Sequence, residues 1–142
     1  MTTSRGLVAV LCAGAAAAAV GCGGDVSPPR AYPVSGTVLV KGKAVAGVKV
    51  SFHAQFKMGA YNFTPFGTTD KDGRFTVTTK TANDGAPPGD YLLTFEKLQA
   101  GADARGQDID VDVRKGKYGD PARGEKVTVA SGDNVLGPFQ LN

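Results

Sequence analysis

The chain has 142 residues, and its 16 basic and 13 acidic side chains give a formal net charge of +3 at pH 7. A charge this small, without a basic cluster interleaved with aromatic residues, argues against nucleic-acid binding. Glycine (20 residues) and proline (8 residues) are frequent, and there is no tryptophan and a single histidine, His53. This composition is typical of a small β domain with many tight turns.

Residues 1–21 have the order of a secretory signal peptide, with Arg5, an apolar run from Gly6 to Val20, and then Gly21. The run is too short and too rich in alanine for a membrane-spanning helix. Cys22 follows directly, and the arrangement resembles the lipobox of bacterial lipoproteins. That resemblance implies that the Cys22 thiol carries a diacylglycerol with palmitate-type chains. The alternative is an ordinary secretory signal without a lipid.

We therefore expect an exported protein held by lipid at the cell membrane or the outer membrane. Cleavage before Cys22 removes Arg5 and Cys12, which leaves 15 basic and 13 acidic residues, a net charge of +2. Cys22 is then the only thiol, so the core must hold the domain without an intramolecular disulfide. Residues 22–33 are rich in Gly and Pro and predict a semi-stiff tether.

Residues 34–142 alternate apolar and polar side chains in short runs separated by turn residues, and no amphipathic helix is evident. We expect the first two runs to form a hairpin, and Asp70–Gly73 to turn the chain within a second hairpin. The expected strands are 34–40, 48–52, 66–69, 74–79, 91–95, 109–113, 127–129 and 139–141.

Seven or eight short strands at this spacing predict one all-β domain with two packed sheets. The inward-facing positions of these strands form the expected core. They are Val34, Val38, Val40, Val48, Val50, Phe52, Phe75, Val77, Tyr91, Leu93, Phe95, Val127, Val129, Phe139 and Leu141.

Several stretches together resemble a known family. The most specific is Gly36–Phe52, which has the pattern G-x-V-x-x-x-G-x-x-V-x-G-V-x-V-x-F. The second is Thr69–Phe75, which has the pattern T-D-x-D-G-x-F. Gly85–Tyr91, Lys115–Pro121 and Gly137–Leu141 complete the match. The chain is similar to bacterial lipoproteins with a carboxypeptidase regulatory-like, transthyretin-like domain. The resemblance implies a Greek-key β-sandwich (transthyretin-like or Ig-like) over residues 34–142, without catalytic residues.

Two acidic segments raise the question of a bound metal. Asp70–Gly73 begins like a calcium loop, but its twelfth position is Thr81 rather than glutamate, so a turn is the better interpretation. Asp108, Asp110 and Asp112 would project from one face of a strand. A bound Ca²⁺ would relieve their repulsion, and so would solvation on an edge strand that resists aggregation. They are the only candidate metal ligands, and no cofactor is expected.

The sequence offers no catalytic grouping, because His53 lies on the outward face of its strand and nothing marks a partner for it. We expect no enzymatic activity. The expected function is a membrane-anchored structural or binding domain, whose partner is an envelope protein or glycan. One alternative is a glycan- or peptide-binding module that uses loops 55–65 and 101–117, with Tyr61, Phe63 and Phe66 as a platform or as packing at the core edge. The other is a calcium-stabilised adhesion-type domain.

Overall fold

The structure is a computed structural model that describes residues 27–102, 104–112 and 116–142, with the side chains of 108–111 left undescribed. It contains nine strands and one short 3₁₀ helix, η1, within this part of the chain. The strands are β1 (Val34–Val40), β2 (Lys43–Ala44), β3 (Val48–Ala54), β4 (Phe66–Thr68), β5 (Arg74–Thr76), β6 (Gly89–Ala102), β7 (Asp108–Asp112), β8 (Glu125–Val129) and β9 (Asn134–Leu141), with η1 at Pro121–Arg123.

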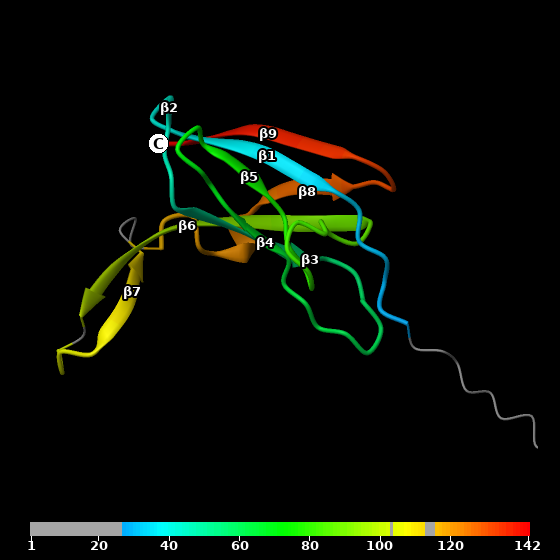
Figure 1. The fold of residues 1–142 in the computed structure, drawn as a ribbon, viewed down its shortest axis with the longest axis horizontal. Coiled ribbons are helices and arrows are strands. Elements are labelled where there is room, and N and C mark those ends of the chain that lie inside the picture. The colour runs from blue at the N-terminus through cyan, green and yellow to red at the C-terminus, as the bar shows by residue number, and fades with distance from the viewer. Residues whose placement is uncertain (1–26, 103, 113–115) are drawn as a thin grey trace, which may run out of the picture.

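The strands form two sheets that pack as an all-β sandwich, which confirms the predicted fold class (Figure 1). In the first sheet β1 pairs antiparallel with β2 and β5 and parallel with β9. In the second sheet β3 lies between β4 and β6, and β6 also pairs with β7 and β8. After visiting the first sheet through β5, the chain returns as β6 beside β3, which is a Greek-key type of connection.

The predicted hairpin between the first two runs is wrong. β1 and β3 belong to different sheets, and the two-residue β2 is the strand that pairs with β1. The buried hydroxyl of Thr69 explains the crossover, because it donates to the carbonyl of Val45 (2.6 Å) and accepts from the amide of Val48 (2.9 Å). These bonds guide the chain from one sheet to the other, and alternation alone does not reveal them.

The predicted Asp-Gly turn is confirmed, although its two arms diverge. Gly73 has φ +72°, and the Asp70 carboxylate accepts the amides of Asp72 (2.8 Å) and Arg74 (3.0 Å). Beyond the turn, β4 pairs with β3 and β5 pairs with β1, so the arms belong to opposite sheets. One bridge between Phe66 and Thr78 still links them.

The core lies between the sheets and contains most of the predicted positions. Val40, Val127 and Phe139 are only partly buried, whereas Ala86, Pro65 and Pro87 are fully buried and were not predicted. Gly36 interrupts the valines of β1 for a steric reason, since a Cβ there would lie 2.5 Å from the Phe75 ring. The inward face of β1 therefore needs a position without a side chain opposite a large aromatic ring.

β6 is much longer than the predicted 91–95 strand. Its first half pairs with β3 and β8 inside the sandwich, and residues 98–102 pair with β7. This second half and β7 project from the body as a two-stranded ribbon (Figure 1). The predicted strand near 109–113 is thus confirmed as β7, and Gly101 and Ala102, at the start of the predicted 101–117 loop, belong to β6.

Candidate functional site

One end of the sandwich collects the loops with the most distinctive side chains. We call residues 30–32, 55–65 and 79–90 the tether end, because the segment that leads in from the N-terminal side enters the domain there. Tyr32 and Ala86 exchange backbone hydrogen bonds of 2.9 and 3.0 Å, and the amide of Gln55 donates to the carbonyl of Asp90 (2.9 Å). Segment 86–90 thus joins the entering chain to the β3–β4 loop, and Figure 1 shows both leaving the sandwich at the same end.

An aromatic pair with a lysine beside it dominates the β3–β4 loop. The rings of Tyr61 and Phe63 stack with centroids 5.4 Å apart and planes inclined by 18°. Lys80 Nζ lies 5.0 Å from the Tyr61 ring centre and 5.2 Å from that of Phe63. Such contacts between a cation and aromatic faces stabilise the arrangement by about 0.5–1 kcal/mol at exposed sites.

Phe66 does not join this pair, so the structure brings together two of the three predicted platform residues. Its ring is 43% exposed on β4, where Lys49 Nζ lies 5.5 Å from the ring centre. Tyr61 and Phe63 are half-buried. The β3–β4 loop also surrounds a shallow cavity of about 370 Å³, lined by His53, Phe56, Met58, Tyr61 and Phe63 among others.

Phe56 anchors the loop to the core. Its ring meets Tyr91 edge-on, with centroids 5.3 Å apart, and it covers Gly89, where a Cβ would lie 2.3 Å from the Phe56 ring. The hydroxyl of Tyr91 donates to the carbonyl of Pro87 (2.7 Å), and burial raises the pKa of Tyr91. Tyr91 was predicted as a core residue, but its polar link to the tether end was not foreseen.

Asp84 organises the loop that carries Lys80. Its carboxylate accepts the amides of Thr79 (2.6 Å), Lys80 (2.9 Å) and Thr81 (2.9 Å). Partial burial acts to raise the pKa of Asp84, but these backbone hydrogen bonds outweigh it and lower the pKa below its ordinary value. In the sequence, Asp84 stands in a short Asn-Asp-Gly segment, which by itself indicates a turn but not the three hydrogen bonds of the carboxylate.

His53 is half-buried on the outward face of β3, as its place in the alternation predicts. Its Nε2 lies 2.9 Å from the hydroxyl oxygen of Thr94, a buried residue on the neighbouring strand β6. This contact fixes the ring across the sheet. It gives His53 a structural role in joining β3 to β6.

The three strand aspartates are placed on β7, at alternate positions opposite Ala102, Ala100 and Leu98 of β6. Asp112 accepts the amides of Lys97 (3.1 Å) and Gly116 (2.7 Å), which engages both of its oxygens in the local backbone. The side chains of Asp108 and Asp110 lie outside the described residues. Within the described part, no three His, Cys, Asp or Glu residues gather as a metal site, and the calcium hypothesis stays a prediction.

Cys22, the predicted lipid site, and residues 1–21 lie outside the described residues. The last part of the predicted tether, residues 27–33, is described. Arg30 lies over the ring of Tyr32, with its guanidinium carbon 5.3 Å from the ring centre. No helix in the part that the structure describes is long and apolar enough to cross a membrane.

A second concave surface opens between the sheets, where β6 and β9 face one another. This cleft has a volume of about 430 Å³, and its lining includes Phe95, Phe139, Lys117, Tyr118 and Arg123. The Phe95 and Phe139 rings contact each other with centroids 5.4 Å apart. The cleft therefore combines apolar rings with cationic side chains in its lining.

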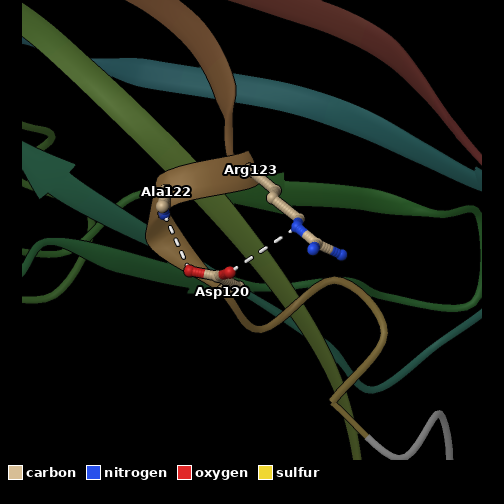
Figure 2. A network of polar contacts seen from close by, with 3 residues as sticks. All are labelled: Asp120, Ala122 and Arg123. Atoms are coloured by element: carbon tan, nitrogen blue, oxygen red, sulfur yellow. Dashed lines mark hydrogen bonds and ion pairs between the residues drawn. The ribbon is translucent and has the colours of Figure 1, made fainter.

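The short helix η1 presents Arg123 at this cleft. Asp120 caps the helix by accepting the amide of Ala122 (2.9 Å), and its other oxygen lies 3.8 Å from Arg123 Nε (Figure 2). The guanidinium is 87% exposed, so the ion pair adds at most about 1 kcal/mol to stability. In the sequence, Asp120 and Pro121 belong to the Lys115–Pro121 stretch of the family resemblance, which did not indicate the cleft.

No protein-family model matches this chain, and a search of curated proteins finds none that is significantly similar.

Proposed function

We propose that this protein is an exported bacterial lipoprotein whose Cys22 carries the lipid, and whose β-sandwich binds or supports a component of the cell envelope. The observation that carries the proposal is the order of residues 1–22, a basic residue, an apolar run and a small residue before cysteine. Two or three acyl chains on one residue provide a stable anchor, because each buried CH₂ contributes about 0.8 kcal/mol.

The arrangement of the described domain is compatible with such an anchor. Ordered pairing begins at Tyr32, ten residues after Cys22, so a short spacer separates the lipid from the first sheet contact. We include no catalytic activity in the proposal. The reason is that the one histidine of the sequence, His53, is engaged with Thr94 and the sequence offers no second one.

Metabolic labelling with a fatty-acid analogue tests the anchor. We expect the wild-type chain to incorporate the label and the Cys22→Ala variant to lose it. Cys12→Ala is the matched control, because it removes the other thiol from within the predicted signal segment and should label normally. Equal labelling of the wild type and Cys22→Ala would contradict the proposal.

The cleft supports a second candidate function, the binding of an envelope glycan or peptide. Tyr118 and Phe139 offer ring surfaces there, and Lys117 and Arg123 offer positive charge. Titration of the isotope-labelled protein with soluble peptidoglycan fragments should shift the amide resonances around Tyr118 and Phe139. Arg123→Ala should weaken the effect, and an unchanged spectrum of the wild type would rule out these fragments as ligands.

A further inference from the structure

We propose that the tether end is a membrane-contacting surface, which lies against anionic lipid headgroups and sets the orientation of the sandwich on the bilayer. The proposal rests on the lipid anchor inferred above and adds a second contact to it. The residues that carry it are Tyr61, Phe63 and Lys80, with Lys57 and Arg30 beside them.

The first argument is the length of chain between the lipid and the domain. Cys22 precedes Ser27, the first described residue, by five positions, and five extended residues span at most about 18 Å. Tyr32 then pairs with Ala86 at the tether end. A lipid on Cys22 therefore allows this end of the sandwich to reach the bilayer surface directly, whereas the opposite end lies a full strand length further from the point where the chain enters.

The second argument is the chemistry of the side chains. Tyrosine and phenylalanine rings combined with lysine and arginine are characteristic of surfaces at the headgroup level of a bilayer, where an apolar body and a polar tip are both accommodated. Here the Tyr61–Phe63 stack has Lys80 beside it, and Tyr32 has Arg30 over its ring. Met58, half-buried in the same loop, adds an apolar side chain next to the exposed Lys57.

The third argument is charge. Within the part of the chain that the structure describes, Arg30, Lys57 and Lys80 take part in no salt bridge. Three carboxylates lie at or beside this end and keep their negative charge. Asp84 accepts three backbone amides, Asp90 accepts the hydroxyl of Thr128 (2.6 Å), and the exposed Asp133 lies beside Pro33. Because no carboxylate of the described residues forms an ion pair with Arg30, Lys57 or Lys80, these cations can contact phosphate groups of anionic lipids, and each contributes about a fivefold preference for contact.

A single tryptophan introduced as a fluorescent reporter tests the orientation. The chain has no tryptophan of its own, so all tryptophan fluorescence comes from the introduced position. The strands of the described residues lie within 34–141, so a chain from Cys22 to Asn142 contains both sheets. Its single thiol is coupled to a maleimide lipid in vesicles of phosphatidylglycerol and phosphatidylcholine. Tyr61→Trp places the reporter at the tether end, and Lys43→Trp on the exposed β2 places a control reporter at the other end.

We expect headgroup spin-labelled lipid to quench tryptophan at position 61 and to leave tryptophan at position 43 unquenched. In the Tyr61→Trp background, the double substitution Lys57→Ala and Lys80→Ala should lower the ratio of molecules whose tether end contacts the bilayer to molecules whose tether end does not. We expect a decrease of about 25-fold at low ionic strength. Lys43→Ala with Lys71→Ala removes the same charge from the opposite end and should leave quenching unchanged. High salt should also weaken quenching at position 61, since it screens exposed charges.

Equal quenching at both positions, or none at either, would overturn the proposal. So would a response of position 61 to soluble peptidoglycan fragments without quenching by lipid, which would assign the loop to a glycan or peptide. Loss of quenching in the lysine control variant would also contradict it. Since the coupling supplies the anchor chemically, these outcomes are independent of whether cells acylate Cys22, which the labelling experiment decides separately.

Discussion

The two ends of the sandwich are built differently. The far end, residues 41–47 and 70–74, consists of short turns whose charged side chains are exposed. Its backbone hydrogen bonds link these turns to one another and to the adjoining strands. The tether end contains two long loops, 55–65 and 79–90, which are joined by the hydrogen bond from Gln55 to Asp90, and the first of them carries the aromatic pair. The turns at the far end serve to reverse the chain, whereas the loops at the tether end present side chains in a fixed arrangement.

The difference is clearest at two glycines with similar backbone angles. Gly42 at the far end (φ +76°) has no heavy atom within 4 Å of the position a Cβ would take. Gly85 at the tether end (φ +87°) is so crowded that a Cβ would lie 1.7 Å from the carbonyl oxygen of Tyr32. Position 42 requires glycine only because of its backbone conformation. Position 85 also requires it because the entering chain packs closely against it.

The largest expected effect is therefore from Gly85→Ala. We expect it to lower the free energy of unfolding by at least about 3 kcal/mol, because it adds backbone strain and disrupts the Tyr32–Ala86 pairing. Gly42→Ala should cost only about 1 kcal/mol, from its left-handed conformation. Urea denaturation of both variants measures the comparison, and equal losses would show that the two ends are constrained alike.

Removal of one hydroxyl from the tether end and one from the cleft should give a smaller difference. Tyr91→Phe leaves the Pro87 carbonyl without its partner in the core, so we expect a loss of about 1–3 kcal/mol. Tyr118→Phe removes a hydroxyl that bonds Asn142 at an exposed site, and we expect less than about 1 kcal/mol. Chemical denaturation at pH 7 checks both, and a larger loss for Tyr118→Phe would contradict the account.

The pH dependence of Tyr91 has a definite sign. Its pKa is raised in the folded protein, so the folded state holds the phenol proton more tightly than the unfolded chain. The stability it contributes is complete below the ordinary tyrosine pKa of about 10 and is lost as the pH rises above it. Wild-type stability should therefore fall more steeply in that range than that of Tyr91→Phe, and parallel curves would be the contrary result.

Among the substitutions at the tether end, Asp84→Asn should have the smallest effect. We expect a loss of about 1 kcal/mol at pH 7, because amides bind less strongly to a neutral oxygen. The pKa of Asp84 is lowered, so its contribution is present above the ordinary value of 3.8 and disappears as the pH falls below it. Asp72→Asn at the far end is the matched control, and thermal denaturation between pH 7 and pH 2 should separate the two variants.

Alternation along the strands predicted the all-β class and most of the core, because inward positions repeat every second residue. It did not predict which strands pair, since pairing depends on the buried Thr69 hydroxyl and the divergent arms of the Asp-Gly turn. Ala86, Pro65 and Pro87 were missed because loop residues have no such period.

The sequence indicated Tyr61 and Phe63 as candidate binding residues, but it could not assign Lys80 to them. Lys80 follows β5 and the aromatic pair lies between β3 and β4, so they meet only through the crossing of the chain between the sheets. The cleft beside Arg123 was missed for the same reason, because β6, β9 and η1 contribute to it from distant parts of the chain.

The mass of the N-terminal tryptic peptide tests the central claim most directly. The protein is isolated from the membrane fraction of cells that produce it and is digested with trypsin, which cuts after Arg30. The account predicts a peptide from Cys22 to Arg30 that carries a diacylglycerol on sulfur. An N-terminus at another residue, or an unmodified Cys22 thiol in the membrane fraction, would contradict the lipid anchor.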